Sequence, residues 1–206
     1  MLRVGLTGGI ACGKTVVASV FECRGAYLHR ADQASHRLMN PGGPAWTAVR
    51  DRFGARIVRT DGTIDRKVLG AVVFRDAKAR RDLEKILHPL VLADLRAAAA
   101  KAETSGGVRI FVSEAALIYE TGLENFFDRV VVVKCDRRTQ TKRLMERDGL
   151  TKAEAERRLA AQMDPAAKAR RADYVINTSG ALEETLARAE AVYTLLLDES
   201  ASAKRK

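Results

Sequence analysis

Cysteine is scarce in this chain, with three residues among 206. Cys12, Cys23 and Cys135 are odd in number and lack both CxxC spacing and nearby histidine clusters, so neither a disulfide framework nor a zinc site is indicated. No apolar stretch approaches the roughly 18 residues of a membrane span, and residues 1–6 are too short for the apolar region of a signal peptide. We therefore expect reduced thiols, no membrane partner and a cytoplasmic location.

Aromatic residues are also few, at 5% of the chain, although the net charge is +10. A basic domain can bind the phosphate backbone of nucleic acid. Residues 137–171, however, hold eleven Lys and Arg against five Asp and Glu and contain no aromatic side chain on which a base could stack. We therefore expect small phosphorylated ligands and no nucleic acid, while solvated helix faces account for part of this charge. The basic residues 204–206 are expected to form a disordered, solubilising tail.

The most specific pattern that is present lies near the start of the chain, where residues 8–15 read Gly-Gly-Ile-Ala-Cys-Gly-Lys-Thr. This is the phosphate-binding sequence G-x-x-x-x-G-K-[ST], and it joins a predicted strand to a predicted helix. Gly8 and Gly13 allow successive N–H groups to point inward, where they bind a polyphosphate together with the positive end of the helix dipole. Lys14 would reach the β- and γ-phosphates of ATP, and Thr15 would hold Mg²⁺ through its hydroxyl. ATP is therefore expected to contact Gly8, Gly9, Ile10, Ala11, Cys12, Gly13, Lys14, Thr15 and Val16.

The length of the chain fits one α/β core with inserted helices better than two independent domains. Runs with strand character are each followed by helical sequence, which predicts a parallel sheet, and they cover residues 2–6, 25–28, 108–112, 129–133 and 174–176. We therefore predict an α/β P-loop NTPase fold of three αβα layers, with a helical substrate-binding insertion and a lid. Its parts are expected to be a nucleotide-binding core at residues 1–31, an acceptor-binding insertion at 32–104, continued core at 105–136, a basic helical lid at 137–171, and a C-terminal strand and helix with a basic tail at 172–206.

The predicted insertion is almost entirely helical. One helix is expected from about residue 31 to residue 39, and further helices run from residue 44 to about 104, with Asp65 and Asp76 as N-caps. The pair His88-Pro89 is expected to interrupt the last of these helices, because the residue before a proline is biased away from the helical conformation. Residues 56–59 give the one hint of a strand or loop.

Three classes of P-loop protein fit the motif: small-molecule kinases, GTPases, and motor or nucleic-acid ATPases. A GTPase needs a downstream Asn-Lys-x-Asp, which the chain lacks, and the D-x-x-G match at residues 51–54 falls at the end of a helical run. Motor ATPases of this fold usually have longer chains and an Asp at a strand end, whereas the strand at 108–112 is followed by Ser113 and Glu114. A small-molecule kinase is therefore favoured. Another nucleoside or small-metabolite kinase, or a basic nucleic-acid-binding ATPase, stays an alternative.

The chain resembles the dephospho-coenzyme A kinases over nearly its whole length. The resemblance depends on the order and spacing of motifs at residues 5–10 with 13–15, at 31–32, 87–89, 117–120 and 147–150, at 158 with 162–163, and at 172–177. Members of this family use ATP to phosphorylate the 3′-hydroxyl of dephospho-CoA, which completes coenzyme A. The resemblance therefore implies a phosphotransferase with an alcohol acceptor, ATP and Mg²⁺, and we expect it to act as a monomer.

The chemistry of phosphoryl transfer assigns a catalytic role to Lys14, and the resemblance assigns catalysis to Asp32 and Arg147. Asp32 would accept the proton of the attacking hydroxyl and contact the acceptor, although an Asp before a helical run is also a favoured N-cap. Arg147 would clamp the transferring phosphoryl group when the lid closes, unless it is an ordinary surface arginine. His88 would lie on the dephospho-CoA side, and a capping or buried structural histidine is the alternative.

Other residues receive binding roles in the same way. Arg158 and Gln162 would bind substrate in the same cleft, or would simply be solvated side chains. Asn177 would help to hold the adenine, or would be a turn residue after the last strand. From its place at a strand end, Glu114 would steady Mg²⁺ through water, and Glu120 would do so less directly; ordinary salt bridges are the alternative for both.

The chain departs from the family pattern at several positions. Arg30 stands where the family has the first acid of an Asp-Ala-Asp motif, Ala116 replaces a proline, and Ala11-Cys12 replaces the usual Gly-Ser of the loop. Cys12 lies beside a helix N-terminus, which favours a thiolate. We therefore predict faster alkylation at Cys12 than at the other cysteines, with protection by ATP, unless it is an inert substitute for serine.

Overall fold

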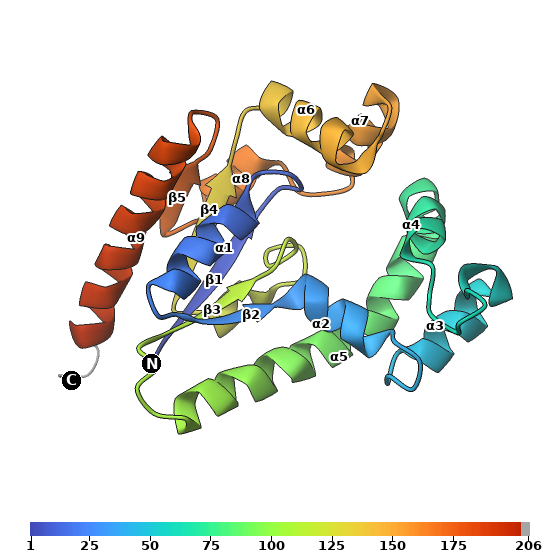
Figure 1. Ribbon diagram of the computed structural model, residues 1–206, viewed down its shortest axis with the longest axis horizontal. Helices are drawn as coiled ribbons and strands as arrows, with labels where there is room; N and C mark the ends of the chain where they lie inside the picture. The colour runs from blue at the N-terminus through green and yellow to red at the C-terminus, as the bar shows by residue number, and fades with distance from the viewer. Residues whose placement is uncertain (203–206) are drawn as a thin grey trace. The chain divides into compact units, whose positions relative to one another are not determined.

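The computed structural model describes residues 1–202, so the predicted tail at residues 204–206 lies outside the described residues. One compact unit comprises Met1–Arg30 and the chain from Ala99 onward. It contains a five-stranded parallel sheet in the order β2-β3-β1-β4-β5 (Figure 1). The strands are β1 (Leu2–Gly8), β2 (Tyr27–Arg30), β3 (Ile110–Glu114), β4 (Arg129–Lys134) and β5 (Tyr174–Asn177). Because all strands are parallel, their carboxyl ends meet at one edge of the sheet.

Side chains alternate between the two faces of this sheet, because successive residues of a strand point to opposite sides. Val4, Leu6 and Val112 lie on one face, in a buried cluster with residues of two helices, α1 (Lys14–Cys23) and α9 (Leu182–Ser202). These helices lie side by side on that face (Figure 1), and the rings of Phe21 and Tyr193 pack with their centroids 5.3 Å apart. Strands β1, β3 and β4 are buried along most of their length, which explains why they are short, mainly apolar runs.

The basic segment between β4 and β5 folds into three helices: α6 (Arg137–Asp148), α7 (Lys152–Ala160) and α8 (Pro165–Ala169). Thr151 and Glu154 form a capping box at the start of α7. Lys168 of α8 is fully buried, where its Nζ donates to the carbonyl oxygen of Ala116 at 2.6 Å and pairs with Glu120 Oε1 at 2.8 Å. This buried pair attaches the end of the helical segment to the chain that follows β3, ahead of the short helix η2 (Leu123–Phe126).

Residues Ala31–Ala98 form the second compact unit. It contains α2 (Ala31–Leu38), α3 (Trp46–Phe53), the short helix η1 (Ala55–Ile57), α4 (Arg66–Arg75) and the part of α5 (Ala77–Thr104) up to Ala98. As predicted, Asp65 caps α4 by accepting from the backbone N–H of Lys67 and Val68, and Asp76 accepts from the N–H of Lys78 at 2.7 Å. Although α5 has 28 residues, no helix within residues 1–202 is long and apolar enough to cross a bilayer.

Helix α5 continues through His88 and Pro89, so the predicted interruption is wrong. A proline inside a helix removes one hydrogen-bond donor and crowds the carbonyl four residues earlier, at a cost of about 3 kcal/mol. Here Leu83, Leu87 and Leu90 pack against the buried core of the same unit on both sides of the proline. Ending the helix at this point would expose those side chains to water, so packing outweighs the lost hydrogen bond.

Several strand boundaries also differ from prediction. Strands β2 and β3 begin and end two residues later than expected, and β1 extends to Gly8. The predicted strand or loop at residues 56–59 contains the end of η1 and one antiparallel bridge between Val58 and Ile64. Asn177 is the last residue of β5 and does not follow it.

Candidate active site

The P-loop connects the carboxyl end of β1 to the first turn of α1, as predicted. Gly8 has a φ of 153°, and a Cβ at this position would lie 2.1 Å from the carbonyl oxygen of Val133 on β4, so only glycine fits. Gly13 is the N-cap of α1 and has a φ of 79°, in the left-handed region that favours glycine. The first N–H groups of a helix have no partner within it, and the helix dipole adds positive potential there. The loop therefore has the geometry of an anion-binding site.

Lys14 is half-buried and folds back over this loop. Its Nζ donates to the carbonyl oxygens of Gly8 at 3.1 Å and Gly9 at 3.0 Å. Because the four-carbon stem of a lysine is flexible, the ammonium can move from these carbonyls to the oxygens of a phosphate. The positive charge is therefore already held within the loop.

Thr15 and Glu114 place two oxygen atoms that could bind a metal ion at the carboxyl edge of the sheet. Thr15 is in the first turn of α1, and its Oγ1 donates to Glu114 Oε1 at 2.9 Å. Glu114 is the last residue of β3, and its side chain is only 12% exposed. Hydroxyl and carboxylate oxygens suit a hard cation such as Mg²⁺. Glu120, the other carboxylate considered for this role, instead neutralises buried Lys168 and accepts from the N–H of Met163 at 3.0 Å.

The backbone of Ile10 is held by two glutamines of the helical segment. Its N–H donates to Gln162 Oε1 at 2.8 Å, and its carbonyl oxygen accepts from Gln140 Nε2 at 2.8 Å. The side chains of Ile10 and Ala11 pack on a small apolar cluster of α6 and α7 that includes Leu144. The predicted substrate residue Gln162 therefore contacts the tip of the P-loop. Gln140 was not identified from the sequence. The signal that could have revealed it is that a polar residue lies on the buried face of α6.

The loop after β5 approaches the P-loop through Thr178, which sequence reasoning also missed. Thr178 is buried, and its Oγ1 donates to the carbonyl oxygen of Cys12 at 2.9 Å. Arg143 of α6 donates to the carbonyl oxygen of Thr178 at 2.9 Å. Asn177 Oδ1 accepts from the N–H of Ser179 at 3.0 Å, as a turn residue does. The side chain of Asn177 thus supports the loop that brings Thr178 to the P-loop.

Arg147 and Arg158 meet at one carboxylate where α6 ends. Arg147 Nε donates to Asp148 Oδ1 at 2.8 Å, and Arg158 Nη1 donates to Asp148 Oδ2 at 2.7 Å. The hydrogen bond from Arg147, followed by the charges of both arginines, lowers the pKa of Asp148 against the raising effect of its burial. The two predicted lid arginines therefore belong to one cluster that joins α6 to α7.

Asp32 and His88 both lie in the second compact unit. Asp32 is exposed in the first turn of α2, and among residues 1–202 its carboxylate accepts no hydrogen bond, so it is not an N-cap. One turn later, His36 Nδ1 lies 2.6 Å from Arg66 Nη1. Burial and the charge of Arg66 lower the pKa of His36, and the Asp32 carboxylate opposes this. His88 is exposed in the middle of α5, so it is neither a cap nor a buried structural histidine.

Cys12 of the P-loop contacts Cys135, the first residue after β4. Both are free thiols, and Cys135 Sγ donates to Cys12 Sγ across 3.7 Å. This hydrogen bond favours the thiolate and lowers the pKa of Cys12 to about 7, with a smaller contribution from the charge of Lys14. The same contact raises the pKa of Cys135. Cys12 is nevertheless fully buried while Cys23 is exposed, which argues against the fast alkylation of Cys12 that its position predicts.

We expect the reactivity of Cys12 to depend on its sulfur partner. In a Cys23→Ser background, labelling of Cys12 by a small thiosulfonate should rise as the pH passes through about 7, because only the thiolate reacts. Cys135→Ala removes the S–H donor, so the pKa of Cys12 should rise and the midpoint of the rate profile should move to higher pH. Mass spectrometry of the Cys12 peptide over a pH series measures both midpoints. Equal midpoints in the two proteins would contradict the hydrogen bond.

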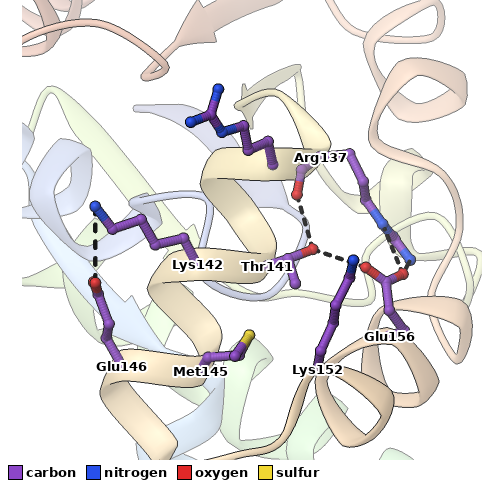
Figure 2. Close-up of a pocket in the computed structure, with 8 residues that line it drawn as sticks. Arg137, Thr141, Lys142, Met145, Glu146, Lys152 and Glu156 are labelled. Atoms are coloured by element: carbon purple, nitrogen blue, oxygen red, sulfur yellow. Dashed lines mark hydrogen bonds and ion pairs between the residues drawn. The ribbon is translucent and has the colours of Figure 1, made fainter.

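A cavity of about 600 Å³ lies on α6 and α7 (Figure 2). Four of its charged residues form two pairs: Arg137 binds Glu156 across the two helices, and Lys142 Nζ lies 3.9 Å from Glu146. Thr141 Oγ1 donates to Glu156 Oε1 at 3.0 Å. None of the P-loop residues lines this cavity. The contacts of Glu156 with Arg137 and Thr141 therefore hold α6 to α7.

Known proteins provide an independent comparison. A family model described as dephospho-CoA kinase matches residues 2–184. The chain is 46% identical over 190 residues to a dephospho-CoA kinase of Anaeromyxobacter dehalogenans, with 92% of this chain and 90% of that protein covered. It is also similar to the crystal structure of TT1252 from Thermus thermophilus, with a TM-score of 0.76, 28% identity, and coverage of 95% and 97%. A dephospho-CoA kinase from Campylobacter jejuni gives a TM-score of 0.69 at 25% identity, with coverage of 96% and 98%.

Proposed function

This chain belongs to the dephospho-CoA kinase family, and we propose that its P-loop, Asp32 and lid residues share the transfer of a phosphoryl group from ATP to the 3′-hydroxyl of dephospho-CoA. The products are coenzyme A and ADP. The observation that carries the assignment of roles is the P-loop itself, where glycine-only backbone geometry, a helix N-terminus and Lys14 converge. Phosphoryl transfer needs positioning and charge neutralisation more than covalent catalysis, and this loop supplies both.

The phosphates of ATP are proposed to bind the backbone N–H groups of the loop from Gly8 to Val16. Lys14 then exchanges the carbonyl oxygens of Gly8 and Gly9 for the β- and γ-phosphates. The N–H of Ile10 is bound to Gln162, so phosphate binding at that amide would require this hydrogen bond to break. The loop and the lid would therefore respond to the nucleotide together.

Mg²⁺ is proposed to be held by Thr15, with Glu114 beside it. These residues suit Mg²⁺ because both offer oxygen ligands: the Thr15 hydroxyl oxygen and a Glu114 carboxylate oxygen lie 2.9 Å apart beside the P-loop. When bound, Mg²⁺ supplies neutralisation of the charge on the phosphates. Glu114 orients the Thr15 hydroxyl by accepting its hydrogen bond, which turns the lone pairs of that oxygen outward.

Asp32 is proposed to accept the proton of the attacking 3′-hydroxyl. Its carboxylate is exposed and is used in no hydrogen bond among residues 1–202, so it is available to an acceptor alcohol. It stands two residues beyond the end of β2, in the motif that the family resemblance assigns to catalysis. His88, exposed on α5, is proposed to contact dephospho-CoA from the unit Ala31–Ala98, which would bind the acceptor.

The helical segment at residues 137–171 is proposed to act as the lid. Arg147 would clamp the transferring phosphoryl group, and its bond to Asp148 holds the guanidinium at the end of α6 until then. Arg158, Gln162 and Asn177 each have a protein partner, which supports an indirect role for them in positioning the lid, the P-loop and the loop after β5.

The proposed function is tested by comparing which acceptor molecules the enzyme phosphorylates. ADP release should be fast with dephospho-CoA and at background with adenosine or common nucleosides, and the phosphate should appear on the 3′-oxygen by phosphorus NMR. Equal rates with adenosine would point to another nucleoside kinase, and stimulation by oligonucleotides with a steep salt dependence would point to a nucleic-acid-binding ATPase. A monomeric state and a cytoplasmic location stay predictions from the sequence.

A further inference from the structure

Arg30 occupies an unusual place at the carboxyl edge of the sheet. It is the last residue of β2, and the parallel register sets it directly opposite Glu114, the last residue of β3. Arg30 Nε lies 3.8 Å from Glu114 Oε2, while Glu114 Oε1 accepts from Thr15. One oxygen of this carboxylate therefore accepts a hydrogen bond from the proposed Mg²⁺ ligand, and the other forms an ion pair with Arg30.

Arg30 is itself anchored on its far side. Its Nη2 donates to Glu22 Oε2 at 2.6 Å, and its Nη1 lies 3.4 Å from Glu22 Oε1, so the guanidinium faces the carboxylate with both nitrogens. Glu22 and Thr15 are seven residues apart on α1, which places them two turns apart on one side of the helix. A continuous chain of contacts thus runs from Thr15 through Glu114 and Arg30 to Glu22.

The exposure of these groups separates this chain of contacts from an ordinary surface ion pair. The side chains of Arg30 and Glu114 are 25% and 12% exposed, whereas Glu22 is 46% exposed. Exposed pairs contribute little because water competes with them. Because the guanidinium is planar and both of its Nη atoms face Glu22, its Nε is held in one place beside the partly buried Glu114 carboxylate.

We propose that Arg30 is a positioning residue for Mg²⁺: it fixes the orientation of Glu114, so that Thr15 and Glu114 present their oxygens to the ion together. This inference rests on the Mg²⁺ site of the proposed function. Mg²⁺ requires near-ideal octahedral geometry, so an oriented carboxylate is worth more to it than a mobile one. Glu22 offsets the charge of Arg30, so that the three side chains together keep one net negative charge near the ion.

Charge and positioning predict opposite results for Arg30→Met. Removing a cation 3.8 Å from Glu114 should strengthen Mg²⁺ binding if only charge matters. If Arg30 positions Glu114, the variant should bind Mg²⁺ about tenfold more weakly, the usual effect of removing a partner of a metal ligand. We expect the weaker Mg²⁺ binding. Arg30→Lys keeps the charge but can meet only one carboxylate at a time, so it should recover part of the loss.

The test measures ATP binding by calorimetry without acceptor, once in EDTA and once over a series of Mg²⁺ concentrations. For Arg30→Met we expect unchanged ATP affinity in EDTA and a Mg²⁺ requirement about tenfold higher. Glu22→Gln, which removes the anchor but leaves Arg30, should shift the requirement in the same direction by less. Arg24→Met is the matched control, because Arg24 Nε pairs with exposed Glu190 at 3.3 Å in the same unit. Arg24→Met should leave the ATP affinity and the Mg²⁺ requirement unchanged. The temperature of thermal unfolding should be the same in all of these variants.

Two outcomes would overturn the inference. One is an Arg30→Met protein whose Mg²⁺ requirement is unchanged or lower, and the other is an equal loss of ATP affinity with and without Mg²⁺. The variants Thr15→Ala and Glu114→Gln show whether such an outcome means a wrong role for Arg30 or a wrong Mg²⁺ site. If these two variants raise the Mg²⁺ requirement while Arg30→Met does not, only the role of Arg30 is wrong. If neither raises it, the Mg²⁺ site itself is wrong.

Discussion

Lys14→Ala should lower the kcat for phosphoryl transfer to dephospho-CoA by about 10³-fold, because the variant lacks the ammonium that would neutralise the β- and γ-phosphates as charge develops on them. The loss should fall mainly on kcat, since the loop N–H groups and the helix dipole still bind the phosphates. The fold should be retained, because the side chain is only half-buried and its Nζ donates to backbone carbonyls of the loop and not to the buried core. Steady-state ADP release at saturating ATP and acceptor measures the effect.

A matched lysine provides the control for this experiment. Lys142 of α6 is 74% exposed and pairs loosely with Glu146, so Lys142→Ala should keep the wild-type kcat. Thermal unfolding of both variants shows whether either change affects stability. A Lys14→Ala enzyme that turns over at close to the wild-type rate would remove the P-loop lysine from the mechanism.

Asp32→Asn should lower kcat by roughly 10²–10⁴-fold, the usual effect of removing a general base. Asparagine keeps the shape of the side chain but cannot take the proton of the 3′-hydroxyl. ATP affinity should stay unchanged, because the proposed role of Asp32 concerns the acceptor alone. Since the carboxylate accepts no hydrogen bond among residues 1–202, Asp32→Ala should also leave the unfolding temperature unchanged, whereas loss of an N-cap would cost about 1 kcal/mol.

The control is another exposed aspartate of the same unit. Asp51 on α3 is 60% exposed and pairs with its neighbour Arg50, and Asp51→Asn should keep the wild-type rate. Single-turnover measurements with enzyme in excess of ATP report the chemical step without product release. An Asp32→Asn enzyme with an unchanged single-turnover rate would refute the assignment of the base.

Local sequence determined the elements that depend on neighbouring residues. The P-loop was predictable because its glycines, Lys14 and Thr15 lie within eight residues, and their backbone geometry follows from the residue types themselves. The N-caps at Asp65 and Asp76 were predictable for the same reason, since each side chain bonds to N–H groups two or three residues away. The parallel sheet followed from short apolar runs separated by helices.

Only the tertiary structure decided which distant residues meet at the site. Gln162 reaches the N–H of Ile10 across 152 positions of sequence, and Cys135 reaches Cys12 across 123. These contacts depend on strand register and helix packing, which no local pattern encodes. The sheet register sets Arg30 opposite Glu114, so the residue that departs from the family motif belongs to a chain of contacts that reaches Thr15. Tertiary packing also decided the course of α5 at Pro89, because the apolar contacts of this helix outweigh the local preference of a proline to end a helix.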